Sequence, residues 1–132
     1  MKHQIASRMK HLAVETIRLV EGLPGTGTRD IIGRQLIRSV TSVGANYRAA
    51  CRARSRADFI AKIAIAEEES DETQYWLELL KELTLIDEEQ FRQLFDEADQ
   101  LTAILASSGR TAKQNRISTQ SISRQSSIQN PK

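Results

Sequence analysis

Apolar residues recur at helical spacing through most of this chain, and no proline interrupts them. The two prolines, Pro24 and Pro131, both lie outside the periodic segments. A proline inside a helix removes a hydrogen bond and clashes with the preceding turn, so their placement permits long uninterrupted helices. No segment shows the two-residue alternation that a half-buried strand requires. The sequence therefore predicts an all-α protein.

The periodic segments are separated by short connections. The first runs from Ile5 to Val20 and stops at the glycine-rich stretch 22–27. The second begins near Thr28 and carries its apolar stripe as far as Cys51. A glycine in the middle of this second helix, Gly44, costs about 1 kcal/mol relative to alanine. We therefore expect a neighbouring helix to approach closely at that position.

The third and fourth segments open with sequences typical of capping boxes, in which two residues three apart bond each other's backbone. These pairs are Ser55 with Asp58 and Asp87 with Gln90. Gly109 is expected to end the fourth helix, since glycine is favoured just past a helix end. Four helices with short connections predict an antiparallel up-down-up-down four-helix bundle.

The residues after Gly109 differ in composition from the rest of the chain. They are rich in serine and glutamine, carry no acid, and contain five basic residues, namely Arg110, Lys113, Arg116, Arg124 and Lys132. Such a segment buries too little apolar surface to offset the entropy lost on ordering. We expect residues 1–109 to form the bundle and residues 110–132 to form a disordered basic tail.

Features absent from the sequence limit where the protein can be located and which chemistry it can perform. With Cys51 as the only cysteine, no intrachain disulfide can form, which favours a reducing cytoplasm. No apolar run approaches the ~18 residues of a membrane span. A di-iron bundle needs Glu-x-x-His motifs, and neither His3 nor His11 follows a glutamate by three residues. The sequence predicts no enzyme, no catalytic or metal-ligating residue and no cofactor, and it places Cys51 in the core as an inert thiol.

The net charge of +2 conceals a strong segregation of charge. Residues 29–56 hold seven arginines and one acid, whereas residues 58–99 hold fourteen acids and three basic residues. At 100° per residue, four of these arginines fall within about 80° of arc, opposite the apolar stripe. This basic ridge consists of Arg34, Arg38, Arg48 and Arg52, and it is extended into the following turn by Arg54 and Arg56.

The basic ridge has three interpretations. Arginine makes bidentate contacts with phosphate, so the ridge suits a nucleic-acid backbone. It also suits an acidic protein surface. The third interpretation is a solvated face, because like charges four residues apart cost only ~0.2–0.5 kcal/mol per pair. No aromatic residue interleaves the ridge, so base stacking is not predicted.

The third segment has apolar residues on two sides. Its core stripe begins at Phe59, and a second side carries four further residues: Ile65, Trp76, Leu79 and Leu83. Aromatic anchors are enriched at protein interfaces. We therefore predict an interface between identical copies on this second side. The alternative is that Trp76 only widens the core of its own bundle.

Several motifs in order resemble one protein family. They include SVGANY at 42–47, RSRADF at 54–59 and ETQYWLELL at 72–80. The chain from about residue 5 to residue 105 resembles the S23, or 23S rRNA intervening-sequence, proteins. These are related by fold to the accessory proteins of diversity-generating retroelements. The resemblance implies a four-helix bundle that assembles as a ring-shaped homopentamer and binds RNA or nucleoprotein through a basic surface.

The residues and the resemblance together lead to one main hypothesis and one alternative. The main hypothesis is a non-catalytic RNA-associated protein that binds phosphates through the basic ridge. The alternative is an adaptor whose basic helix docks on an acidic protein, such as a polymerase or a ribosomal component.

Overall fold

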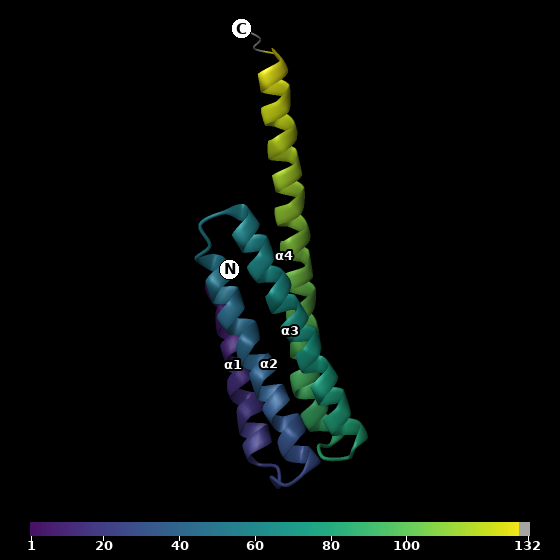
Figure 1. Ribbon diagram of the computed structural model, residues 1–132. Helices are drawn as coiled ribbons and strands as arrows, with labels where there is room; N and C mark the ends of the chain where they lie inside the picture. The colour runs from purple at the N-terminus through teal and green to yellow at the C-terminus, as the bar shows by residue number, and fades with distance from the viewer. Residues whose placement is uncertain (130–132) are drawn as a thin grey trace.

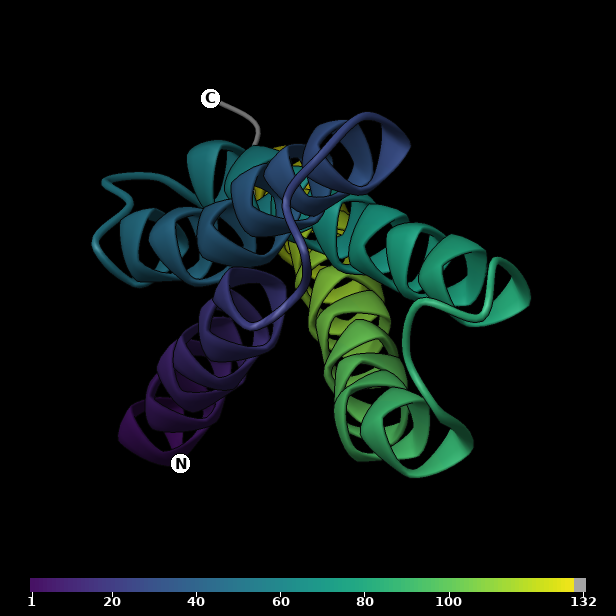
Figure 2. The same ribbon diagram turned by 90° about the horizontal axis from the view of Figure 1, so that it is seen from below.

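The computed structural model describes the backbone of residues 1–129 and the side chains of residues 1–115. This part of the chain contains four helices and no strand. The helices are α1 (Lys2–Glu21), α2 (Thr28–Cys51), α3 (Arg56–Glu82) and α4 (Glu88–Gln129). Each runs antiparallel to the one before it (Figure 1). Seen from below, α2 and α3 lie along one side of the bundle with α1 and α4 along the other (Figure 2). The predicted all-α, up-down-up-down architecture is confirmed.

Local capping sequences fix where α3 and α4 begin. The backbone N–H of Asp58 donates to Ser55 Oγ at 3.0 Å, so Ser55 caps α3 as predicted. At the start of α4, Gln90 N–H donates to Asp87 Oδ1 at 2.8 Å, and Asp87 N–H donates to Gln90 Oε1 at 3.0 Å. These bonds satisfy backbone donors that have no partner inside their own helix.

The predicted apolar stripes meet in one core. Its fully buried side chains come from all four helices and include Met9, Leu36, Ile63, Leu77, Leu80, Leu101 and Leu105. Burial of each such side chain stabilises the fold by roughly 1.5–3 kcal/mol. None of the described helices is both long enough and apolar enough to cross a membrane.

A buried polar seam runs through this core along α3. Thr73 Oγ1 donates to Ser39 Oγ on α2 at 3.0 Å. On the opposite flank, the hydroxyls of Ser70 and Thr102 are 2.7 Å apart, and Thr102 Oγ1 donates to Gln74 Oε1 at 2.9 Å. Buried polar groups that all find partners rigidify a core. The seam therefore ties α3 to both α2 and α4.

The first helix is held by packing and by one ion pair. Arg8 on α1 donates to Glu97 on α4 through two bonds, of 3.0 and 2.6 Å. Against α2, a Cβ added to Gly33 would lie only 2.8 Å from Cγ1 of Val20. A Cβ on Gly44 would meet Met9 Cβ at 3.6 Å, an ordinary contact. The tight approach that the sequence suggested at Gly44 is therefore found at Gly33.

The expected helix end at Gly109 is wrong. α4 continues to Gln129 and projects beyond the other three helices (Figure 1). A glycine ends a helix by adopting a left-handed conformation, and among the described glycines only Gly27 has a positive φ. Gly109 instead packs against α3, where an added Cβ would lie 3.5 Å from Ile63 Cγ2.

The predicted division of the chain into a bundle of residues 1–109 and a tail of residues 110–132 stays a prediction. Arg110 to Asn115 are helical, and Ala112 is half-buried. The side chains of residues 116–132 and the backbone of residues 130–132 lie outside the described residues. The disorder predicted for the tail stays a prediction for residues 130–132, whose backbone lies outside the described residues.

Candidate nucleic-acid interface

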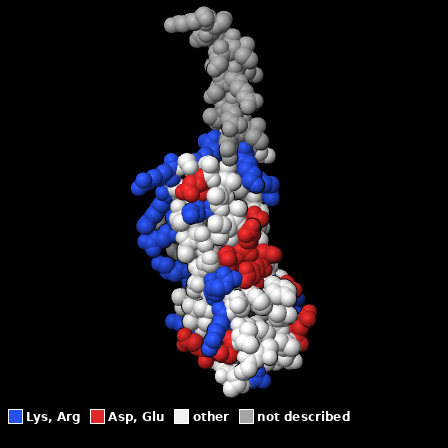
Figure 3. All heavy atoms as spheres, in the orientation of Figure 1, with Lys and Arg blue, Asp and Glu red and all other residues white. Residues whose placement is uncertain are grey.

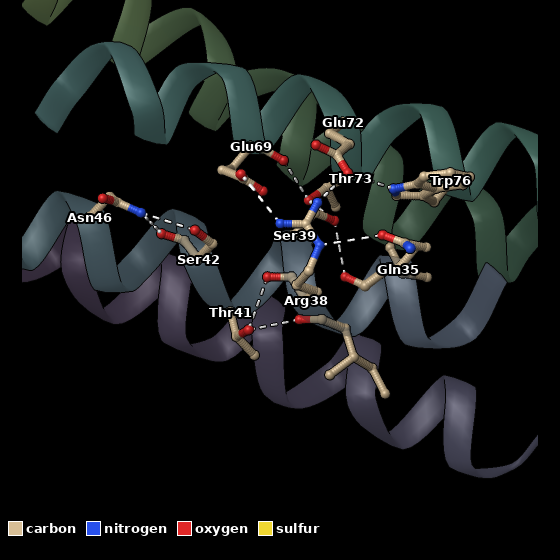
Figure 4. A network of polar contacts seen from close by, with 12 residues as sticks. Gln35, Arg38, Ser39, Thr41, Ser42, Asn46, Glu69, Glu72, Thr73 and Trp76 are labelled. Atoms are coloured by element: carbon tan, nitrogen blue, oxygen red, sulfur yellow. Dashed lines mark hydrogen bonds and ion pairs between the residues drawn. The ribbon is translucent and has the colours of Figure 1, made fainter. Parts of the chain in front are cut away.

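The fold divides the basic ridge into two parts, and the first part is paired with acids. On α2 itself, Arg34 Nη2 lies 2.8 Å from Asp30 Oδ2. Arg38 crosses to α3, where it donates to Glu72 Oε1 and where its Nη1 lies 3.5 Å from Glu69 Oε1. Figure 4 shows this guanidinium pointing at both carboxylates. The predicted phosphate ligand Arg38 is thus already engaged by acids of its own chain.

Glu72 sits at the centre of this contact between helices. It accepts from Arg38 and also from Trp76 Nε1, at 3.2 Å. The hydrogen bond with Glu72, followed by the charge of Glu69, raises the pKa of Arg38 above its ordinary value. The guanidinium therefore stays charged at any ordinary pH, and its charge is locally compensated.

The second part of the ridge is exposed and lies at the far end of α2. The guanidinium groups of Arg48, Arg52 and Arg54 have no ion-pair or hydrogen-bond partner among the side chains of residues 1–115. We call these three residues the free arm. No acid occurs from residue 44 to residue 57, and Arg56, also exposed, follows directly. Figure 3 shows Lys and Arg gathered along this edge, with Asp and Glu collected over the middle of the bundle.

The four predicted interface residues share one side of α3, but they differ in exposure. Ile65 is 39% exposed and Leu83 is 50% exposed. Trp76 and Leu79 are half-buried and pack against the core. Trp76 thus widens the core of its own bundle, which was one interpretation. It also leaves part of its side chain exposed, as the predicted interface between copies requires.

On α2 and α3, two further large apolar residues are exposed that were not identified from the sequence. Tyr75, 54% exposed, packs edge-to-face on Trp76 with ring centroids 5.1 Å apart. Ile31 on α2 is 64% exposed. Arg38 on α2 contacts Glu72 on α3, and the two helices are antiparallel. Ile31, seven residues before Arg38, therefore lies level with Leu79, seven residues after Glu72. The sequence did contain a signal for Ile31. Ile31 is seven residues from Arg38 and therefore lies on the same side of α2, outside the apolar stripe that forms the core.

These residues define a surface that combines apolar and charged groups. We call it the α2–α3 outer face, and it comprises Ile31, Arg38, Ile65, Glu72, Tyr75, Trp76, Leu79 and Leu83. The free arm adjoins the end of this face that carries Ile65, which by the same register is level with residue 45 of α2. It is distant from the other end, since Arg48 is seventeen residues, or about 25 Å, from Ile31 along α2.

The remaining sequence candidates for chemistry lie in or beside the core. Cys51 is half-buried next to Tyr47. Burial, followed by the neighbouring thiol, raises the pKa of Tyr47 to about 12. Within the described residues, no group of three or more His, Cys, Asp or Glu side chains is arranged to hold a metal ion.

Comparison with known proteins adds to this geometry. Residues 1–107 match the model of a family described as 23S rRNA-intervening sequence protein. A crystal structure of a protein of unknown function, from the S23 ribosomal protein family of Bacteroides thetaiotaomicron, is 34% identical to this chain. The match covers 80% of this chain and 97% of that one, with a TM-score of 0.73. No curated protein matches this chain.

Proposed function

We propose that this chain, which belongs to the 23S rRNA-intervening sequence protein family, binds RNA phosphates through the free arm without catalysing a reaction. The observation that supports this proposal is the absence of any described partner for the guanidinium groups of Arg48, Arg52 and Arg54. Arginines that carry uncompensated charge on an exposed helix are suited to bidentate phosphate contacts.

Pairing within the chain reduces the number of arginines that serve this function. Arg34 and Arg38 both have carboxylates beside them. One chain therefore offers few phosphate contacts, and its affinity alone should be at the level of non-specific binding. Useful affinity then requires several copies of the free arm on one particle.

Assembly of identical copies is the second part of the proposal. The α2–α3 outer face offers a side for another copy, with Ile31, Tyr75 and Leu83 as exposed apolar groups. The resemblance to the family implies five copies in a ring. Because the free arm lies about 25 Å along α2 from Ile31, RNA would not compete with a neighbouring copy that is seated on Ile31, Tyr75 and Leu83.

The alternative function is an adaptor for an acidic protein, such as a polymerase or a ribosomal component in the cytoplasm. The contact of Arg38 with Glu69 and Glu72 favours it, because it shows that the ridge accepts carboxylates in this fold. Salt dependence separates the two functions, since counterion release from nucleic acid gives a steep slope of log affinity against log salt.

The experiment compares RNA binding by the wild type and by Arg48→Glu with Arg52→Glu, at two salt concentrations. Both positions are exposed and unpaired among the described side chains, so the variant should keep its fold. We expect weaker binding and a slope reduced by about 0.7 for each phosphate of single-stranded RNA that the variant no longer neutralises.

The matched control is Lys2→Glu with Lys10→Glu, which makes the same change in charge on exposed positions of α1. It should lower affinity far less. Equal reductions in both variants would show a general charge effect and would remove the free arm from the site. If the wild type binds no RNA even at low salt, the adaptor function replaces this proposal.

A further inference from the structure

A cleft lies where the α2–α3 turn faces the part of α4 that continues past the family match. Its volume is about 640 Å³, which falls in the range of roughly 300–1,000 Å³ typical of small-molecule sites. The turn and the start of α3 contribute Arg54, Arg56 and Phe59, and α4 contributes Ser108, Thr111 and Asn115. Helices distant in sequence thus form its two walls.

The lining of this cleft is basic and polar. Two arginines face hydroxyl and amide side chains, and no Asp or Glu is among the described residues that line it. A smaller cavity of about 210 Å³, on the part of α4 nearby, adds Arg110 and Lys113, with Glu67 as its acid. Guanidinium groups with neighbouring hydroxyl donors and no carboxylate are the environment that a phosphate group prefers.

An aromatic ring completes the lining. Phe59 is half-buried, packs against the core and also lines the cleft. Its position is therefore fixed by the bundle. Unstacked RNA bases are held on aromatic side chains, with their phosphates on arginine. No aromatic residue lies within the basic ridge on α2. Phe59 belongs to the core stripe of α3, and the fold places it in the same cleft as Arg54 and Thr111.

We propose that this cleft binds an unpaired nucleotide, with its phosphate on Arg54 and Arg56 and its base against Phe59. This inference rests on the proposed function and sharpens it, because it makes RNA with unpaired ends or loops the preferred ligand over blunt duplex. Thr111 and Asn115 lie beyond residue 107, where the family match ends. The site therefore belongs to the extension of α4 in this chain and not to the matched part alone.

The test measures binding of adenosine 5′-monophosphate, adenosine and inorganic phosphate to the full chain by calorimetry. The nucleotide should bind more tightly than either of its parts. Arg54→Gln removes one charge from the cleft, and Thr111→Trp fills it from an exposed position. Each should weaken nucleotide binding by about tenfold or more. For Arg54→Gln this corresponds to the loss of one charge-assisted hydrogen bond, and for Thr111→Trp it follows from the ring occupying the space of the nucleotide.

Two matched controls keep the result interpretable. Arg92→Gln removes an arginine from the opposite end of α4, and Ala103→Trp adds the same large ring at an exposed position that lines neither cavity. Both should bind the nucleotide as the wild type does. A duplex with an unpaired overhang should lose affinity for the Thr111→Trp variant, whereas a blunt duplex of equal length should not.

Failure of this inference is distinguishable from failure of the proposed function. If the nucleotide does not bind at millimolar concentration, or binds the Thr111→Trp variant unchanged, the cleft is not a nucleotide site. The proposed function still stands in that case if RNA binding depends on Arg48 and Arg52. Binding of free nucleotide without any preference for the overhang would show a small-molecule site and would overturn the RNA part of the inference.

Discussion

The contrast between two glycines of α2 gives the sharpest test of the packing. Replacing glycine by alanine inside a helix gains about 1 kcal/mol of helix propensity. At Gly44 the new methyl group meets Met9 Cβ at 3.6 Å, so the gain should be kept. At Gly33 it lies 2.8 Å from Val20 Cγ1. Valine is stiff at χ1, and overpacking typically costs about 1–3 kcal/mol.

Two chemically identical changes should therefore have different outcomes. Gly44→Ala should stabilise the protein by about 0.5–1 kcal/mol. Gly33→Ala should range from neutral to about 2 kcal/mol destabilising, once the propensity gain is subtracted from the overpacking cost. The assay is chemical denaturation followed by far-ultraviolet circular dichroism at one fixed protein concentration, because the assembly proposed above would make stability depend on concentration.

A second background shows whether Val20 is the cause. In Val20→Ala the obstructing methyl groups are absent, so Gly33→Ala should cost less there than in the wild type. Stabilisation by Gly33→Ala as large as that by Gly44→Ala would refute the steric explanation. An equal cost of Gly33→Ala in both backgrounds would also refute it.

The outer face and the core each supply one further prediction. Light scattering should give a mass several times the 14.9 kDa of one chain. Leu83→Lys should lower this mass while helicity is retained. A wild-type mass of one chain at all micromolar concentrations would contradict an interface between copies on the α2–α3 outer face. Because burial raises the pKa of Tyr47 from 10 to about 12, its contribution to stability should be complete below pH 10 and should disappear as pH rises from 10 to about 12. Tyr47→Phe should show a smaller decline in stability over that interval, and equal declines would exclude this tyrosine as the cause.

Features set by neighbouring residues were predictable from the sequence. The caps at Ser55 and Asp87 depend on residues three apart, and the helices themselves depend on a 3.6-residue period. The family resemblance is confirmed by the match over residues 1–107. These properties do not require knowledge of how one helix rotates against another.

The contacts of the candidate site depend on how the helices are rotated against one another, and this rotation could not be predicted from the sequence. Arg38 shares one side of α2 with Arg34 and Arg48, and only the packing of α2 on α3 places Glu72 beside it. The helix stop expected at Gly109 was overridden by packing against Ile63, which is distant in sequence but adjacent in space. The site residues of the free arm remain proposals, since their partner is external to the chain.

The buried polar seam also bears on how the helices are aligned. Every hydrogen bond across it involves α3. Thr102 bridges Ser70 and Gln74, which are one turn apart on α3, so sliding α3 by one turn against α4 would keep one of the two beside Thr102 and leave the other without this partner. Each buried polar group left without a partner costs about 1–3 kcal/mol. Alignments of α3 with α2 and α4 other than the observed one are therefore less stable.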